Sequence, residues 1–298
     1  MPIPETQLDT WSKVGSQAQS KDTYATIRNA LDVATAPYTG NIEIFLQGSY
    51  GNDTNVYGKD SDVDIVMRSD RAFFRDLSRL TPEEKATYTA GNGGTADYPF
   101  STFRTDVIKV LKAKFGTDVD TTNKKAIKIK ANGTRRSADV LVCQDHRRYL
   151  RYTGRTDDYV KGIGFNTTDG KLIENYPKFH SASLTAKHQV TSQWLKPTIR
   201  IFKNMRNNLI ANNKVSNGVA PSYYVEGLLW NAADESFGTN YETTVFRCLK
   251  WLQTVDENSL SCANGMSGLL GDNSPIKWST ADFRTFKNGV INLWNDWK

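Results

Sequence analysis

The pattern of apolar and polar residues differs between the two halves of the chain. In the first half, short apolar runs bounded by turn-forming residues predict strands. These strand candidates are residues 42–46, 62–67, 126–130, 138–143, 162–165 and 172–173. Residues 7–34, 71–90 and 101–115 have the composition and spacing of helices, whereas the Gly- and Asn-rich residues 48–61 predict a loop.

The second half is helical from about residue 181 onward. Its clearest feature is an apolar stripe at helical spacing, made of Leu195, Ile199, Phe202, Met205 and Leu209. Apolar positions within 225–229 and 245–252 indicate further helices. We therefore expect a mixed α/β (α+β) part with an N-terminal helix, residues 1–175, followed by a helical domain, residues 176–298.

Composition and charge restrict the class of protein. The chain of 298 residues is 38% hydrophobic, and its 38 Lys and Arg exceed its 32 Asp and Glu, giving a net charge of +6. This composition excludes a disordered or collagen-like chain. No run of 18 apolar residues is present, so we expect no membrane span. The basic excess suits an anionic partner, either nucleic acid or nucleoside triphosphates.

The cysteines, the histidines and the first residues bear on location and on metals. Three widely spaced cysteines, Cys143, Cys248 and Cys262, predict reduced thiols rather than disulfides. The first ten residues lack the basic and apolar regions of a secretory signal, so we expect a cytoplasmic protein. Three histidines without CxxC or HxxxH spacing argue against a zinc site.

A polar motif joins the first two predicted strands. Gly48 and Ser49 follow one strand, and Asp62 and Asp64 open the next. Residues i and i+2 of a strand point to the same face, so the two carboxylates can share metal ions. Two hard divalent cations suit nucleotidyl transfer, and backbone N–H groups and a hydroxyl after the first strand can hold phosphates. Asp139, which opens a later apolar strand, is the best candidate for a third carboxylate.

An Asp-x-Asp pair is weak evidence by itself, because most such pairs lie in solvated turns. The chain contains a second pair, Asp118 and Asp120, which has no Gly-Ser upstream and which we interpret as structural. Asp64 is instead followed directly by Ile-Val-Met. A charge at the mouth of a buried strand needs a partner or a metal ion, which favours the catalytic interpretation of Asp62 and Asp64.

Gly-Ser followed by Asp-x-Asp resembles the signature of the polymerase-β-like nucleotidyltransferases. Further segments are similar to one branch, the E clade (CdnE) of the cGAS/DncV-like nucleotidyltransferases of bacterial anti-phage systems. The segments that carry this resemblance are residues 2–8, 47–50, 138–140, 175–178, 197–204 and 220–223. They extend from residue 2 to about residue 230, and the remaining C-terminal residues carry less that matches.

The resemblance implies a nucleotidyltransferase core followed by a helical domain, with the active site in the cleft between them. It also implies that Asp62, Asp64 and Asp139 hold two Mg²⁺ ions, or Mn²⁺ in their place. In the family, a ribose hydroxyl of one nucleotide attacks the α-phosphate of another and pyrophosphate leaves. A second attack in the same site closes a cyclic messenger, which a separate effector protein receives.

The resemblance also assigns nucleotide-binding residues. Lys203 matches the triphosphate lysine of the family. Lys196, Arg200 and Lys203 recur at helical spacing, although such a run is ordinarily a solvated charged face. Ser222 and Tyr223 match the contacts to the donor nucleotide, and the alternative is a helix cap beside a core aromatic residue.

Asn175 bears on the identity of the base. Pyrimidine-using members of the E clade carry Asn before Tyr-Pro-Lys, and an amide can read the O4 and N3 edge of uracil. We therefore expect cyclic UMP-AMP or cyclic di-UMP, made from UTP with ATP or from UTP alone. The alternative is an Asn that caps a turn before Pro177. Gln47, Gly48 and Ser49 complete the nucleotide-binding set that the resemblance implies.

The chain departs from its relatives in two ways. It lacks the zinc-bearing insertion of the animal DNA sensor, so activation by double-stranded DNA is not indicated. His188 stands where relatives often carry Asn, and we interpret it as a surface residue or a satisfied helix residue.

A basic region and two rival functions stay open. Twelve lysines and arginines, Lys128 among them, lie between residues 109 and 151 without interleaved stacking aromatics. We favour a solvated or substrate-steering face, with RNA binding as the alternative. One rival enzyme makes linear oligonucleotides or modifies an RNA, a protein or a small acceptor. The other rival is a degenerate nucleotidyltransferase that only binds RNA.

Overall fold

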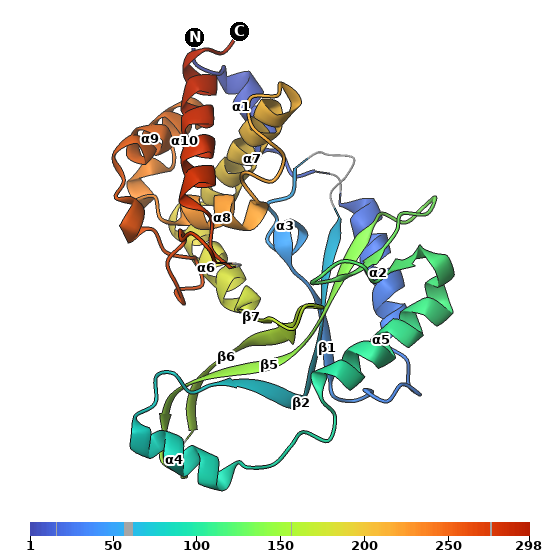
Figure 1. The fold of residues 1–298 in the computed structure, drawn as a ribbon. Coiled ribbons are helices and arrows are strands. Elements are labelled where there is room, and N and C mark those ends of the chain that lie inside the picture. The colour runs from blue at the N-terminus through green and yellow to red at the C-terminus, as the bar shows by residue number, and fades with distance from the viewer. Residues whose placement is uncertain (16, 57–61, 156, 275) are drawn as a thin grey trace. The chain divides into compact units, whose positions relative to one another are not determined.

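The computed structural model describes residues 1–15, 17–56, 62–155, 157–274 and 276–298 (Figure 1). The chain packs as two compact units. The helical unit contains Met1–Gln17, Gly48–Lys59 and Lys178–Lys298, and the sheet unit contains Ala18–Gln47 and Asp60–Pro177. The sequence division placed residues 1–175 in one part, whereas in the structure residues 1–15 and 48–56 belong to the same unit as the C-terminal helices.

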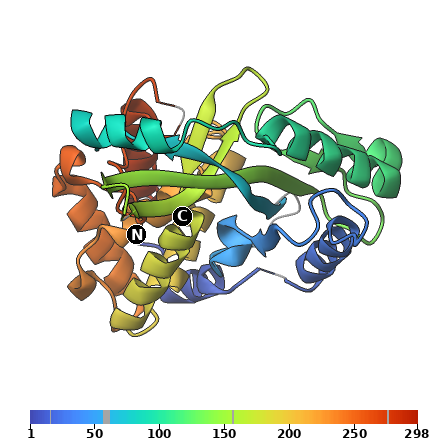
Figure 2. The same cartoon turned by 90° about the horizontal axis from the view of Figure 1, so that it is seen from below.

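The sheet unit is built on one mixed sheet, which has seven strands in the described part of the chain. Its main path runs through β1 (Ile42–Leu46), β2 (Val63–Asp76), β5 (Ala138–Tyr152), β4 (Ile127–Ile129) and β3 (Val119–Asp120). β6 (Asp157–Asn166) pairs with β5, and β7 (Leu172–Asn175) pairs with β6. The long strands β2 and β5 run parallel to each other, and the other described pairs are antiparallel (Figure 2).

The β2–β5 pair sets the position of the predicted carboxylates. Its register is regular from Val63 opposite Ala138 to Ser69 opposite Gln144, and it shifts at a bulge between Ser69 and Phe73. Side chains alternate between the two faces along this regular stretch. Residues that lie opposite each other in this register, one of odd and one of even number, therefore share one face of the sheet.

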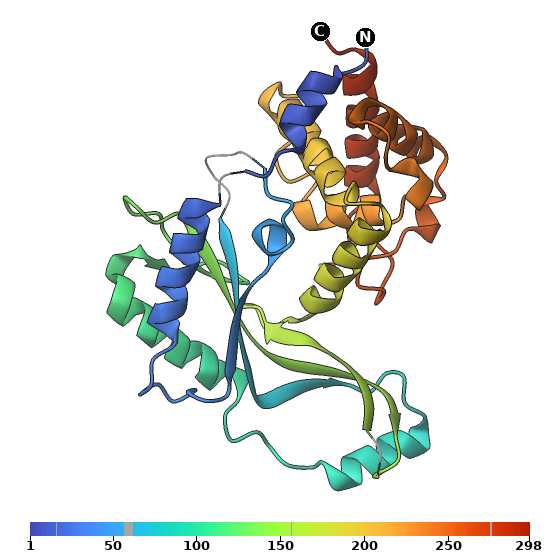
Figure 3. The same cartoon turned by 180° about the vertical axis from the view of Figure 1, so that it is seen from behind.

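Two helices lie side by side in the sheet unit, α2 (Ala18–Leu31) and α5 (Phe100–Phe115) (Figure 3). α5 packs against β5 with Phe103, Val107 and Leu111 buried, and its C-cap is Gly116, whose φ of 55° favours glycine. A short 3₁₀ turn, η1 (Gly116–Asp118), follows.

Helix α4 (Pro82–Gly91) is fixed by a capping box. The Thr81 hydroxyl accepts from the Glu84 N–H, and the Glu84 carboxylate accepts from the Thr81 N–H. With Pro82 at the first helical position, these bonds define where the helix begins.

The helical unit is assembled around α7 (Leu195–Ala211). Its apolar stripe is fully buried at Leu195, Ile199, Phe202 and Met205, which confirms the helix that the stripe predicted. The other elements of this unit are α1 (Glu5–Ser12), α3 (Gly48–Gly51), α6 (Pro177–Val190), α8 (Ser222–Trp230), η2 (Asp234–Ser236), α9 (Tyr241–Thr254), η3 (Glu257–Ser259) and α10 (Thr280–Asn295). α1 and α10 both pack against α7.

Among the described residues, every helix is too short or too polar to cross a bilayer.

Several predicted elements are confirmed. The strand at 42–46 and the helix at 101–115 match β1 and α5, and the strand predicted at 126–130 is β4. The strand predicted at 138–143 is correct at its start but continues to Tyr152 as β5. Local patterning therefore located these elements without fixing how far each extends.

Three predictions about elements were wrong in part. Residues 71–90 are not one helix, because residues 71–76 continue β2 and pair with β5 beyond the bulge, and α4 begins only at Pro82. Residues 7–34 form two helices rather than one, and α2 ends at Leu31. In the predicted loop 48–61, the first four residues form α3, and residues 57–61 lie outside the described residues.

Candidate active site

Strand pairing in the sheet unit places two of the three predicted carboxylates side by side. Asp64 on β2 lies directly opposite Asp139 on β5 in the parallel pair, so both side chains start from the same face. Asp62 directly precedes β2. The Gln47 N–H donates to the Asp64 carbonyl at 3.0 Å, which ties the end of β1 to this point.

Asp62 has two polar partners. The Lys128 ammonium donates to its Oδ2 at 2.9 Å, and the Ser137 hydroxyl donates to its Oδ1. Lys128 stands opposite Asp139 in the β4–β5 pair. One cation of the protein therefore lies among the carboxylates, and Lys128 is one of the residues of the basic region.

The charge of Asp139 is poorly compensated by its surroundings. Its Oδ1 atom is buried and has no hydrogen-bond partner among the described residues. Burial raises the pKa of Asp139, the nearby Asp62 charge raises it further, and Lys128 partly opposes both. A buried oxygen in this state needs a cation.

The carboxylate oxygens of this site are the type of ligand that a hard divalent cation prefers. Within the described residues no group of three His, Cys, Asp or Glu side chains is gathered closely enough to hold a metal ion. The oxygen-only donors and the orphaned Asp139 oxygen nevertheless suit Mg²⁺ or Mn²⁺ better than a softer metal. The site as described is held together by Lys128 and Ser137.

Asn175 is the last residue of β7, and its backbone and side chain are held by neighbouring residues. Its Oδ1 accepts from the Tyr176 N–H at 2.8 Å, which is the local capping bond expected of the structural alternative. Its amide NH₂ is the part of the side chain left for a ligand. Gly162 on β6 lies beneath it, because a Cβ there would come within 2.8 Å of the Asn175 carbonyl and 2.7 Å of the Tyr176 ring.

A buried network supports Tyr176. Its hydroxyl lies 3.4 Å from His146 Nδ1, and His146 Nε2 lies 3.1 Å from Glu174 Oε2. Arg148 pairs with Glu174 and, at 3.0 Å, with Asp76. Burial lowers the pKa of His146 to about 4, so the imidazole is neutral at pH 7. Sequence reasoning did not single out this network.

The Gly48–Ser49 motif opens α3 in the helical unit. Gly48 has φ 65°, a left-handed conformation that favours glycine. The Asn52 N–H donates to the Gly48 carbonyl at 3.1 Å, and the Thr54 N–H donates to the Ser49 carbonyl at 2.9 Å. The turn is therefore closed by its own backbone, and α3 packs against α8.

Lys203 is enclosed by protein oxygens in the helical unit. The residue is only 1% exposed. Its ammonium lies 2.7 Å from Glu226 Oε1, 2.9 Å from Thr54 Oγ1 and 3.2 Å from the Thr54 carbonyl. Burial lowers its pKa, and Glu226 opposes that effect. The lysine therefore fastens the segment after α3 to α7 and α8.

Glu226 is the centre of this buried cluster, and sequence reasoning missed it. Besides Lys203, it accepts from Asn52 Nδ2 at 2.9 Å and Thr54 Oγ1 at 2.5 Å, and its Oε2 lies 2.9 Å from His180 Nε2. Burial alone would raise its pKa, but Lys203 and His180 hold it far below the usual range. The available signal was a single charge in the apolar run 225–229.

The basic side of α7 is not a solvated face. Lys196, Arg200 and Lys203 are 9%, 7% and 1% exposed. Arg200 donates to the carbonyls of Ser12 and Asp53, each at 2.5 Å. The solvated-face alternative was therefore wrong, because these cations bind segments of their own unit.

Ser222 and Tyr223 begin α8, as the helix-start interpretation predicted. Arg206, which sequence reasoning did not single out, lies with Nη1 3.4 Å from Ser222 Oγ and donates to the Ala220 carbonyl at 2.7 Å. The Tyr223 ring stacks on His180 with centroids 4.3 Å apart, and its hydroxyl accepts from Asn264 Nδ2 at 3.1 Å. One face of the tyrosine is therefore already covered.

The structural interpretations of the second Asp-x-Asp pair and of His188 are consistent with the structure. Asp118 pairs with Arg135 at 2.8 Å and Asp120 accepts from the Thr122 N–H at 2.9 Å, so the second Asp-x-Asp is structural. His188 Nδ1 accepts from the Lys196 N–H at 3.3 Å, and burial lowers its pKa to about 4. It is a neutral, satisfied helix residue.

Comparison with known proteins adds independent information. The nucleotidyltransferase domain model matches residues 27–151, and the model of the cGAS/DncV-like nucleotidyltransferase C-terminal helical domain matches residues 182–295. The chain is 37% identical over 298 residues to the cyclic UMP-AMP synthase of Rhodothermus marinus, covering 100% of this chain and 99% of that protein. It is also 37% identical to the cyclic nucleotide synthase CdnE01 of Staphylococcus haemolyticus, covering 100% of both.

A solved structure is similar over the whole chain. The Rhodothermus marinus CdnE c-UMP-AMP synthase with Apcpp and Upnpp superposes with a TM-score of 0.88 at 36% identity. The match covers 99% of this chain and 98% of that chain.

Proposed function

This chain belongs to the cGAS/DncV-like nucleotidyltransferases, and we propose that it makes a uracil-containing cyclic dinucleotide, cyclic UMP-AMP or cyclic di-UMP, in anti-phage signalling. The expected family, the mixed α/β fold with its helical domain and the class of enzyme are confirmed. Membership implies nucleoside triphosphate substrates and dependence on a divalent metal.

The chemistry we propose rests above all on the juxtaposition of Asp64 and Asp139 with an orphaned carboxylate oxygen. Asp62, Asp64 and Asp139 would hold two Mg²⁺ ions. Bound there, the ions supply activation of the ribose hydroxyl and neutralisation of the departing pyrophosphate. The hydroxyl oxygen bonds to the α-phosphorus as the bond to pyrophosphate breaks, and a second such transfer closes the ring.

The helical unit supplies the phosphate-binding groups in this proposal. Gly48, Ser49 and Ser222 belong to α3 and α8, which pack together, and Arg206 lies beside Ser222. Backbone N–H groups, hydroxyls and a guanidinium suit phosphate oxygens. Lys203 acts in our proposal as a positioning residue, because its ammonium is bound to Glu226 and Thr54.

The role of Lys203 can be separated from direct phosphate binding. A buried charge left without its partner costs about 3–5 kcal/mol, so Lys203→Met should lower the unfolding temperature sharply. The double variant Lys203→Met with Glu226→Gln should recover part of that loss, since it removes both charges. A Lys203→Met protein of normal stability whose KM for NTPs alone rises would instead indicate direct contact.

Asn175 is the residue that we propose reads the base. Its amide NH₂ can donate to the O4 carbonyl of uracil, whereas the N6 amino group of adenine offers no acceptor at that place. Full-length similarity to a protein named cyclic UMP-AMP synthase supports the same base. Gln47, next to Gly48, holds the end of β1 through its bond to Asp64.

Product analysis tests the proposal. The purified protein is incubated with Mg²⁺ and each pair of labelled NTPs, then with phosphatase, and the products are identified by mass spectrometry. We expect a phosphatase-resistant cyclic species that contains uracil. Asp62→Ala with Asp64→Ala should abolish it, and Asp120→Ala, in the structural Asp-x-Asp, should not.

Other outcomes distinguish the rivals. A phosphatase-resistant cyclic product that contains only purines would agree with the proposed class of enzyme. It would contradict the proposal that Asn175 selects uracil. Phosphatase-sensitive products identify an enzyme that makes linear oligonucleotides or modifies an RNA, a protein or a small acceptor. We further propose that the reaction occurs in the cytoplasm, where NTPs are available, and that a separate effector receives the product.

A further inference from the structure

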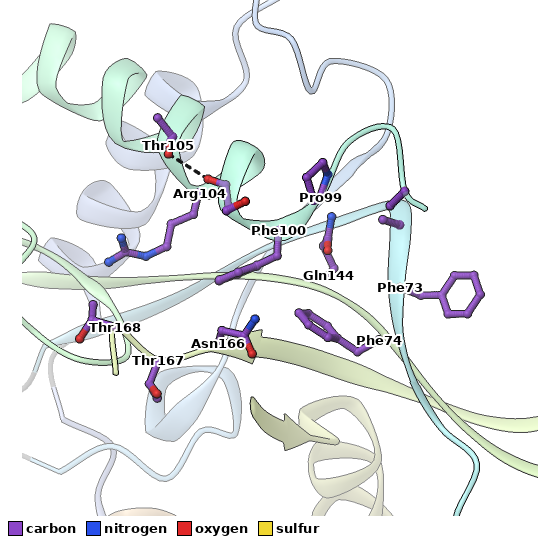
Figure 4. A pocket seen from close by; sticks show the side chains of 13 residues that line it. Phe73, Phe74, Pro99, Phe100, Arg104, Thr105, Gln144, Asn166, Thr167 and Thr168 are labelled. Carbon is purple, nitrogen blue, oxygen red and sulfur yellow. Dashed lines mark hydrogen bonds between the residues drawn. The ribbon is translucent and has the colours of Figure 1, made fainter. Parts of the chain in front are cut away.

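A cavity of about 520 Å³ lies within the sheet unit (Figure 4). Its volume is in the range of small-molecule pockets. The wall is formed by β2 beyond the bulge, the start of α5, the middle of β5 and the end of β6. Phe74, Phe100, Arg104 and Gln144 are among the residues that line it.

This cavity is separate from the carboxylates. Gln144 lines it from β5, on which it stands five residues after Asp139. The register is regular over this stretch, so the two side chains emerge on opposite faces of the sheet. The proposed metal and nucleotide residues do not line the cavity.

Among the described residues that line the cavity, Arg104 is the single charged one. Its Nη2 atom is buried, and it has no hydrogen-bond partner among the described residues. Burial lowers the pKa of Arg104. A buried guanidinium nitrogen without an acceptor is costly, and a bound anion would remove that cost.

The rest of the wall offers flat apolar surface and fixed polar groups. The rings of Phe74 and Phe100 lie 5.9 Å apart and 58° from parallel, and both face the interior, whereas Phe73 points away (Figure 4). Gln144 is held by its bond from Nε2 to the Tyr98 carbonyl at 3.0 Å. A planar ring can therefore pack against the phenylalanines while a charged group reaches Arg104.

We propose that this cavity binds a planar aromatic monocarboxylate. The planar guanidinium of Arg104 matches a carboxylate, and one positive charge balances one negative charge. A phosphate monoester carries nearly two charges at pH 7 and would leave one uncompensated. The ring would pack against Phe74 and Phe100.

The probe for this site is 2-naphthoate, titrated against the full chain by ligand-observed NMR. We expect saturable binding that Arg104→Gln weakens at least tenfold. Lys112→Gln, an exposed cation on the same helix, should leave binding unchanged. The neutral isostere 2-naphthamide should bind at least tenfold more weakly than the acid.

A second variant and a competition experiment test the same cavity. Ala72→Leu narrows the cavity without touching Arg104 and should also weaken binding, so the test stands even where an Arg104 variant does not fold. An excess of a non-hydrolysable NTP should not displace the probe. Absence of saturable binding, equal binding of the amide, or displacement by the nucleotide would each overturn the proposal.

Discussion

Lys128 and Asp139 show how single charges are balanced at the carboxylate site. Lys128 donates to Asp62 and lowers the pKa of Asp139, but burial of Asp139 and the charge of Asp62 outweigh it. Because the folded-state pKa of Asp139 is raised, its ionised form costs folding free energy. That cost is absent well below the ordinary pKa and is complete above the raised one. The folded protein thus keeps a carboxylate that favours binding of a cation.

This balance predicts opposite effects of one substitution with and without metal. In EDTA at pH 7, Asp139→Asn should stabilise the protein by about 1 kcal/mol, because it removes a buried charge. The gain should shrink as the pH falls toward 4. In Mg²⁺ the wild type should gain stability and the variant should not, and synthesis should be lost. Thermal unfolding in both buffers checks this, and an Asp139→Asn protein that is less stable in EDTA would contradict it.

Whether the sequence could identify a site residue depended on whether the pattern around it lay within one short segment. Asp62, Asp64 and Asp139 could be singled out as candidates because strand alternation and the order of the motif are contained within short segments. Glu226 was missed because its partners, Thr54 and Lys203, come from distant segments. A buried ion pair is fixed by tertiary packing, which spacing along one helix does not show.

At the level of elements, pairing partners decide where strands end. The sequence of residues 71–76 is compatible with a helix, but pairing with β5 beyond the bulge extends β2 through them. β1 and α5 were predicted well because each is bounded by local breakers. Strand length in a sheet is a non-local property, and propensity is a weak guide to it.

The β6–β7 contact carries a prediction at this level. Gly162→Ala would push against the Tyr176 ring and the Asn175 carbonyl, since its Cβ would lie within 2.8 Å of both. We expect a loss of about 1–3 kcal/mol in unfolding free energy and a lower share of uracil in the product. Gly94→Ala, which meets nothing within 4 Å, is the matched control. Urea unfolding and product ratios measure both effects, and unchanged uracil content would disconnect this packing from base choice.

At the scale of the whole molecule, each unit contains a histidine that is neutral at pH 7, one buried (His146) and one half-buried (His188). His146 belongs to the sheet unit and His188 to the helical unit, and burial lowers the pKa of each to about 4. In the unfolded chain both titrate near 6.5. The unfolded state therefore binds more protons between these values, and stability is lost as the pH falls from about 6.5 toward 4.

His146 allows this acid sensitivity to be measured in one unit. It is faced by Glu174, Asp76, Arg148 and Tyr176, and burial raises the pKa of Glu174, which acts in the opposite direction. Comparison of the wild type with His146→Gln isolates the histidine. Between pH 7 and pH 5 the wild type should lose roughly 2 kcal/mol more than the variant. Urea unfolding at each pH measures this, and parallel pH profiles would contradict it.

The interleaving of the two units has a consequence for synthesis of the chain on the ribosome. α1 emerges from the ribosome well before the helix it packs against, because α7 is translated more than 180 residues later. The segment after α3 likewise cannot form its native contacts until Lys203 and Glu226 have been translated. The sheet unit is complete once Pro177 has left the exit tunnel, so it can fold while α1 and the segment 48–56 remain without their partners. The residues of α1, although made long before α7, are thus among the last to reach their native contacts.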